Sequence, residues 1–97
     1  MRIREAMEEI HNLAVEKGWW REPRYLPELL CLVHAEVSEC LEAYRRNNSK
    51  GVEEELADIV IRVFDIAQAN GIDLEQAIIK KHNYNKTRSY RHGNKLC

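Results

Sequence analysis

The sequence lacks any apolar run close to the roughly 18 residues that a membrane-spanning helix needs. Chain breakers are also scarce, with four glycines and two prolines among 97 residues, and aromatic residues make up only 7% of the chain. Residues 1–10 include acidic side chains where a secretion signal would carry its apolar stretch. We therefore expect a cytoplasmic protein that does not enter a membrane.

Cysteine is too scarce and too widely spaced for a disulfide framework. Of the three cysteines, Cys31 and Cys40 fall on one expected helix, and their separation in the sequence corresponds to about 13 Å along its axis. That separation exceeds the reach of a disulfide. The cysteines are therefore interpreted as reduced thiols.

The length and charge of the chain predict one small domain, spanning residues 1–97. A chain of this size buries only roughly 60–65% of its unfolded surface, so a partner subunit would stabilise it. The net charge of −1 conceals an asymmetry, because six Lys or Arg residues and no acid follow residue 79. The basic tail, at about 87–97, is interpreted either as a solvated segment or as a phosphate-binding one.

Apolar periodicity predicts an all-α fold, since no segment alternates with the period of a strand. Gly18 and Gly71 follow the first and third periodic segments, where glycine commonly ends a helix. Pro27 fits a first helical turn, and Asp73 with Gln76 forms a capping-box pattern. The predicted helices span about 3–17, 27–46, 52–70 and 73–88.

The third predicted helix is apolar around most of its circumference. On a helical wheel its polar stripe, within about 80°, holds only four side chains. These are Glu55, Asp58, Arg62 and Asp65. A helix with so little polar surface is typical of a buried element, so this stripe is not expected to face open solvent.

Two pairs of carboxylates carry the chemistry: Glu36 with Glu39, and Glu55 with Asp58. Each pair is spaced i, i+3 and so shares a helical face, and a short breaker segment should make the two helices antiparallel. One such pair alone is common on solvated helices, but two on adjacent helices favour a metal site. Four converging carboxylates repel one another unless a cation lies among them. Mg²⁺ combines a few carboxylates with water and substrate phosphates, which indicates a phosphoryl or nucleotidyl substrate.

Several neighbouring residues allow other interpretations. A di-iron bundle requires two Glu-x-x-His motifs, and the sequence has only one, from Glu8 to His11. Asp65 is left open between a metal contact and a pair with Arg62. One of the two adjacent tryptophans, Trp19 and Trp20, is expected to act as a core or interface lid, with stacking on a nucleobase as the alternative.

These motifs resemble those of the MazG-like, all-α nucleoside triphosphate pyrophosphohydrolases, a superfamily that includes dimeric dUTPases and dCTP pyrophosphatases. The resemblance covers about residues 5–95 and rests on three segments in order. They are the segment 34–43, the segment 54–62, and the pattern Lys81-x3-Asn85-x2-Arg88-x3-His92-Gly93.

The resemblance implies hydrolysis of a nucleoside triphosphate between its α and β phosphates. It maps the Mg²⁺ ligands onto Glu36, Glu39, Glu55 and Asp58, with Mn²⁺ able to substitute. Lys81, Asn85 and Arg88 become candidates for holding phosphates or sugar, and Trp19 or Trp20 for stacking on the base. It also implies a homodimer or homotetramer, and therefore a four-to-five-helix bundle completed by oligomerisation.

The mechanism expected from this resemblance gives the carboxylates a second role. Glu39, with Glu36 as the other candidate, would position or deprotonate the attacking water. Lys81 and Arg88 would stabilise the departing pyrophosphate. The alternative is a non-enzymatic helical interaction or regulatory module that binds nucleic acid or protein. The net charge of −1 and the lack of a recognisable helix-turn-helix argue against nucleic acid.

Overall fold

The computed structural model describes residues 2–88, and within this range the chain forms four α-helices and no strand. The helices are α1 (Ile3–Glu16), α2 (Leu26–Arg45), α3 (Ser49–Ala69) and α4 (Leu74–Lys86). The prediction of an all-α fold is therefore confirmed. None of these helices combines the length and apolarity needed to cross a membrane.

The first three helices all end in the same backbone motif. Each is followed by a residue with positive φ, namely Gly18 at 87°, Asn47 at 56° and Gly71 at 67°. Around each of these residues two amide groups donate back to the last turn, as in a Schellman motif. The predicted helix ends at Gly18 and Gly71 thus follow from the freedom of glycine to adopt this conformation.

The start of α3 differs from the prediction, because the helix begins at Ser49 rather than at residue 52. The side chain of Asn48 accepts a hydrogen bond from the amide of Gly51 at 2.9 Å. This N-cap satisfies an otherwise unpaired amide and extends the helix backwards through Gly51. At α4 the cap was placed correctly, since Asp73 accepts from the amide of Gln76 at 3.1 Å.

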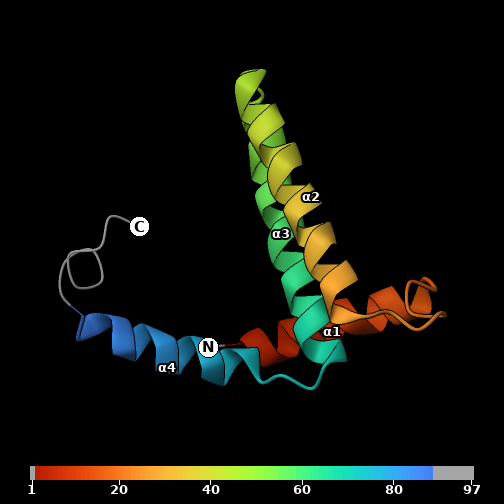
Figure 1. Cartoon of the computed structure of the whole chain (residues 1–97), viewed down its shortest axis with the longest axis vertical. Helices are drawn as coiled ribbons and strands as arrows, with labels where there is room; N and C mark the ends of the chain where they lie inside the picture. The colour runs from red at the N-terminus through yellow and green to blue at the C-terminus, as the bar shows by residue number, and fades with distance from the viewer. Residues whose placement is uncertain (1, 89–97) are drawn as a thin grey trace.

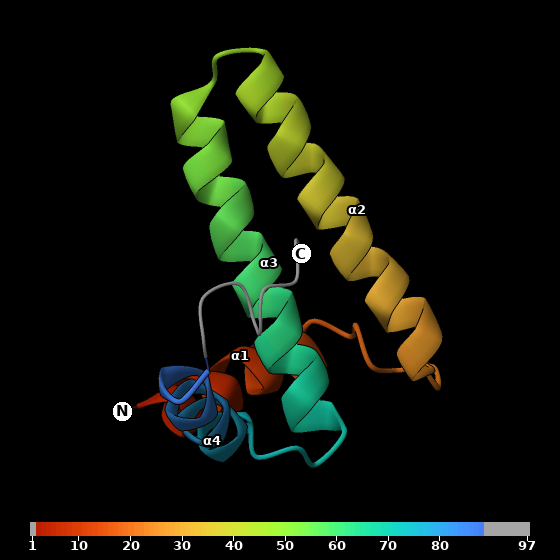
Figure 2. The ribbon, with the colours of Figure 1, turned by 60° about the vertical axis from the view of Figure 1, so that its left-hand side comes forward.

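The α2–α3 hairpin dominates the architecture (Figures 1 and 2). The two helices run antiparallel and pack along each other, and α1 packs against α3 at the end of the hairpin distant from its tip. α4 touches only α1 and α3, and it extends away from the hairpin in Figure 1. The two helices that carry the carboxylate motifs therefore lie side by side, whereas α4 does not contact α2.

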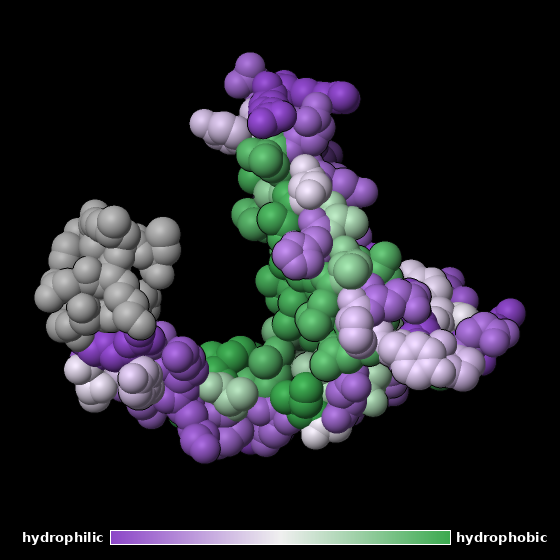
Figure 3. Space-filling view, in the orientation of Figure 1, coloured by the Kyte–Doolittle hydropathy of each residue, from purple (hydrophilic) through white to green (hydrophobic). Residues whose placement is uncertain are grey.

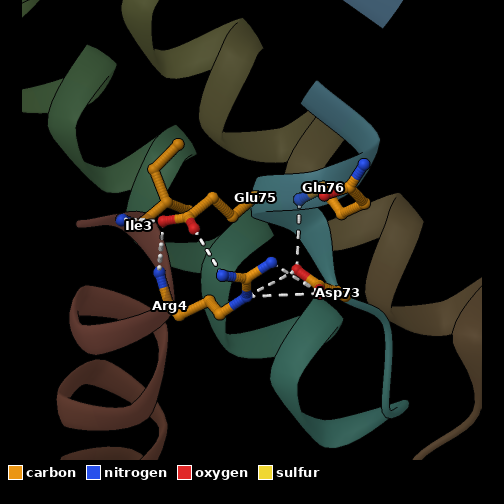
Figure 4. A network of polar contacts seen from close by, with 5 residues as sticks. All are labelled: Ile3, Arg4, Asp73, Glu75 and Gln76. Carbon is orange, nitrogen blue, oxygen red and sulfur yellow. Dashed lines mark hydrogen bonds and ion pairs between the residues drawn. The ribbon is translucent and has the colours of Figure 1, made fainter. Parts of the chain in front are cut away.

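A charged clamp ties the start of α4 to the start of α1 (Figure 4). Arg4 donates to Asp73 at 2.9 Å and pairs with Glu75 at 2.7 Å. The buried Glu75 also accepts from the amide of Ile3 at 2.9 Å, and so caps α1 from another helix. The hydrogen bonds that Arg4 donates to Asp73 lower the pKa of that carboxyl, and they raise the pKa of Arg4.

The buried core is small and lies near the junction of α1 with α3. Its apolar members are Met7, Ala14, Leu29, Ile66 and Ala67. Within the single chain α3 is not covered all round, since Leu56 is 54% and Val60 48% exposed. Three neighbouring helices supply too little surface to cover it. Figure 3 shows apolar residues gathered along the hairpin and continuing to the beginning of α4.

Candidate metal centre

Three of the four predicted carboxylates converge between α2 and α3. Glu36 and Glu39 from α2 and Glu55 from α3 each place one carboxylate oxygen within 4.8 Å of the others. Glu36 and Glu55 are partly buried, and Glu39 is exposed. An all-oxygen set of this kind suits a hard divalent cation such as Mg²⁺.

Glu55 is the most strongly perturbed member of this cluster. Burial, together with the neighbouring carboxyls of Glu36 and Glu39, raises its pKa from 4.5 to about 7. Its Oε2 atom is buried without a hydrogen-bond partner. A buried carboxylate oxygen without a donor is costly, and a cation between these side chains would remove that cost. The residues present therefore fit a divalent metal.

Asp58, the fourth predicted ligand, does not join this group of three. It is exposed and lies one turn after Glu55 on α3. It lines a cavity of about 190 Å³, together with Glu36 of the cluster. The rest of the cavity wall consists of Trp19, Ile61, Arg62 and Asp65. Asp58 thus lies beside the cluster and shares this cavity with Glu36.

Arg62 is the cation that the structure places against the cluster. Its guanidinium donates from Nη2 to Oε1 of Glu36 at 3.0 Å, which joins α3 to α2. Its Nε atom is buried without a partner. The sequence had offered Asp65 as a possible partner for Arg62. Helical spacing alone cannot choose between a neighbour on the same helix and one on the facing helix.

Asp65 is engaged elsewhere in a buried hydrogen-bonded group. Trp20 donates its indole N–H to both carboxylate oxygens, at 3.0 and 3.1 Å, and Nδ1 of His11 lies 2.6 Å from Oδ1. The rings of His11 and Trp20 meet edge to face, with centroids 5.4 Å apart. These contacts favour a structural role for Asp65 over the metal contact that the sequence left open.

The two adjacent tryptophans have different environments. Trp20 is held by Asp65 and has the guanidinium of Arg24 over its ring at 5.8 Å. Trp19 is 55% exposed and lines the cavity that Asp58 and Glu36 also line. Trp20 therefore anchors the loop before α2, whereas Trp19 leaves its ring exposed at the cavity.

The candidate phosphate-binding residues of α4 lie apart from the carboxylates. Lys81, Asn85 and Arg88 are carried on α4 or directly after it, and none of them lines the cavity beside Asp58. Lys81 and Arg88 instead flank the ring of Tyr84, at 5.0 and 5.2 Å from its centroid. His92 and Gly93, which belong to the same sequence pattern, lie outside the described residues.

Two residues of this region were not assigned functional roles from the sequence. In the sequence, His11 stands out only as part of a single Glu-x-x-His motif, and the structure places it against Asp65 rather than among the clustered carboxylates. Arg62 was expected to be a structural or interface residue, although it shares the polar stripe of Glu55. That shared stripe was the signal that could have indicated its contact with the cluster.

The fold and the cluster together define an all-helical protein with an acidic, oxygen-only candidate cation site between antiparallel helices. A family model described as the MazG nucleotide pyrophosphohydrolase domain matches residues 27–91, which is more than half of the chain. The chain therefore belongs to the MazG nucleotide pyrophosphohydrolase domain family. Comparisons with curated proteins and with solved structures gave no match.

Proposed function

We propose that this protein is a Mg²⁺-dependent pyrophosphohydrolase that cleaves nucleoside or deoxynucleoside triphosphates into a monophosphate and pyrophosphate. Its membership of the family supports this activity. The observation that carries the metal dependence is the convergence of Glu36, Glu39 and Glu55, with a buried oxygen of Glu55 left without a partner. We further propose a cytoplasmic role in removing unwanted nucleotides from the pool.

In this proposal Glu36, Glu39, Glu55 and Asp58 hold the metal, and Mn²⁺ can substitute for Mg²⁺. When bound, the ion would neutralise charge that develops on the phosphates. Asp58 and Glu36 both line the neighbouring cavity, in which the phosphates of the substrate would bind. The exposed position of Asp58 is compatible with a ligand that engages only when metal and nucleotide are both bound.

Glu39 is the carboxylate best placed to act as the general base toward the attacking water. Glu36 is held by Arg62, and Glu55 is partly buried, whereas Glu39 is exposed. We therefore propose that Glu39 accepts a proton from a water molecule while the oxygen of that water attacks the α phosphorus. The bond from that phosphorus to the bridging oxygen then breaks, and pyrophosphate leaves with the electron pair. Glu36 is the alternative base.

The remaining substrate contacts are assigned by exposure and charge. Trp19 presents an exposed ring beside the carboxylates and would stack on the base. Trp20, the other candidate, is held to α3 by its bond to Asp65 and is the second choice for this role. Lys81, Asn85 and Arg88 would hold phosphates or sugar, and the positive charges would stabilise the departing pyrophosphate.

Oligomerisation would bring the basic residues of α4 close to the carboxylates of the hairpin. α4 contacts only α1 and α3 of its own chain, and the hairpin exposes Leu41, Leu56 and Val60 by about half. A homodimer or homotetramer would bury this apolar surface. It would also allow α4 of one subunit to approach the carboxylates of another. Sedimentation analysis of the full chain tests this part of the proposal.

Product analysis tests the activity itself. The full chain is incubated with Mg²⁺ and a panel of ribo- and deoxynucleoside triphosphates, and pyrophosphate is measured separately from inorganic phosphate. We expect equal amounts of monophosphate and pyrophosphate, and no turnover when EDTA removes the metal. Inorganic phosphate as the primary product would contradict the proposal, as would the lack of turnover with every nucleotide.

A non-enzymatic module that binds nucleic acid is the second candidate, favoured by one observation. Lys80, Lys81, Tyr84 and Arg88 form a basic surface with an aromatic centre on α4. A nucleic-acid binder would show salt-sensitive binding to DNA or RNA. It would show no gain in thermal stability with Mg²⁺, whereas a metal site at the carboxylates predicts such a gain.

A further inference from the structure

Arg62 makes a contact that the proposed reaction does not use. It lies on α3 one turn after Asp58 and reaches across the hairpin to Glu36, with 3.0 Å between Nη2 and Oε1. The Arg62 side chain is 30% exposed and that of Glu36 is 15% exposed. This pair is therefore shielded from solvent far more than the surface ion pairs of the protein, such as that of Arg46 with Glu42.

The charges around this pair are unbalanced. Glu36, Glu39 and Glu55 bring carboxylate oxygens within 4.8 Å of one another. Within residues 2–88, Arg62 is the one basic side chain that forms an ion pair with any of the three. The guanidinium, paired with Glu36, thus supplies part of the positive charge that a metal ion would otherwise provide. The guanidinium cannot become neutral when a metal ion approaches, because arginine remains charged in proteins.

We propose that Arg62 is an exchangeable counter-ion for the carboxylate cluster, which releases Glu36 when Mg²⁺ enters. This inference rests on the Mg²⁺ site of the proposed function and adds to it a residue that sets metal affinity. In the metal-free protein Arg62 partly neutralises the cluster and holds α3 to α2. When Mg²⁺ binds, Glu36 turns from the guanidinium to the ion, and the two cations repel each other at short range.

The structure leaves room for this exchange. Arg62 lines the cavity of about 190 Å³ that Trp19 and Asp58 also line. Because Arg62 already borders this cavity, its side chain has open volume beside it, into which we propose that it turns when Glu36 engages the ion. The Nε atom, which is buried and unpaired beside Glu36, would gain access to water or ligand there. An unsatisfied donor is a reason for the side chain to favour the new position once Glu36 is engaged.

Calorimetric titration with MgCl₂ on the full chain tests the inference. Arg62→Gln removes the charge and keeps a polar side chain, whereas Arg46→Gln removes an exposed arginine from a pair of similar length and serves as the matched control. We expect Arg62→Gln to bind Mg²⁺ on the order of tenfold more tightly than the wild type. It should also melt at a lower temperature without metal, and Arg46→Gln should change neither property.

Three outcomes are distinguishable in this titration. A wild-type chain that binds no Mg²⁺ would refute the proposed metal site itself. A wild type that binds Mg²⁺, with unchanged affinity in Arg62→Gln, would overturn the counter-ion inference alone. Weaker binding in Arg62→Gln would also overturn it, since Arg62 would then orient Glu36 for the metal rather than compete with the metal.

A measurement on the wild type covers the case in which Arg62→Gln does not fold. The Nε–H resonance of Arg62 is followed by NMR during addition of Mg²⁺, with Arg62→Lys used to assign it. We expect this signal to shift or broaden as the metal-binding sites fill, and the corresponding signal of Arg46 to stay constant. An Arg62 signal that remains unchanged at saturating Mg²⁺ would overturn the inference.

Discussion

Trp20 donates its indole N–H to both carboxylate oxygens of Asp65, at 3.0 and 3.1 Å. The contact links the loop before α2 to the buried end of α3, where Asp65 is 8% exposed. His11 approaches the same carboxylate from α1 at 2.6 Å. One acidic side chain therefore holds three parts of the chain together beside the cavity.

The first prediction concerns the stability that this group provides. Asp65→Ala leaves the N–H groups of Trp20 and His11 without their acceptor, so we expect the free energy of unfolding to fall by about 2–4 kcal/mol. Trp20→Phe keeps an aromatic ring but removes the N–H donor and part of the ring volume, and should cost at least about 1 kcal/mol. Urea unfolding followed by circular dichroism measures both. A loss below about 0.5 kcal/mol for Asp65→Ala would contradict this account.

The second prediction separates the roles of the two tryptophans. Trp19 is exposed and lines the cavity, so Trp19→Ala should leave the melting temperature nearly unchanged. Loss of a base-stacking surface is expected to raise KM for the nucleotide roughly tenfold. Trp19→Phe, which keeps an aromatic face, should recover most of this loss. Unchanged KM in Trp19→Ala would remove Trp19 from the substrate site.

The third prediction concerns Asp58, which the structure places beside the cluster rather than within it. Asp58→Asn should abolish Mg²⁺-dependent turnover and leave the circular dichroism spectrum unchanged, because the side chain is exposed. Glu53→Gln alters an exposed acid on the same helix and should remain active. An active Asp58→Asn enzyme would exclude Asp58 as a metal ligand.

The fourth prediction follows from the pKa of Glu55, which burial and its acidic neighbours raise from 4.5 to about 7. The folded chain therefore binds this proton more tightly than the unfolded chain does. The resulting stabilisation is complete at pH values below 4.5 and disappears as the pH rises through about 7. Without metal, this carboxyl should thus make the protein less stable at pH 8 than at pH 5.

Glu55→Gln provides the control for this pH dependence. The amide is neutral at every pH, so this variant should lose that part of the change in melting temperature between pH 5 and pH 8. Mg²⁺ should bind the wild type more tightly above pH 7, and binding at pH 6 should release protons. An identical pH profile in wild type and Glu55→Gln, both measured in EDTA, would contradict the assignment.

The fifth prediction concerns the clamp that holds α4. Arg4→Met leaves the buried carboxylate of Glu75 without its ion-pair partner (Figure 4), and we expect the melting temperature to fall by roughly 5–10 °C. Amide hydrogen exchange should accelerate throughout α4. Arg2→Met breaks only an exposed pair with Glu5 and should change neither measurement. Equal exchange rates in α4 of both variants would show that the clamp does not hold α4 in place.

Local interactions made much of the fold predictable. Glycine after a helix favours the positive φ that ends it, so Gly18 and Gly71 marked two helix ends correctly. Asp73 marked the start of α4 correctly, because its side chain accepts a hydrogen bond from the amide of Gln76. The start of α3 was missed because Asn48 belongs to a run of polar residues, in which more than one could have been the cap.

The sequence by itself determined the four helices, their order, and the helical face that Glu36 shares with Glu39 and that Glu55 shares with Asp58. Each of these properties depends on residues within one or two turns of one another. Only the tertiary structure decided that Arg62 pairs with Glu36, that Asp65 receives Trp20 and His11, and that α4 stands apart from the carboxylates. Those relationships depend on how separate helices pack. The helical periodicity of a sequence predicts which face of its helix a residue occupies, but it does not predict which residue of another helix it contacts.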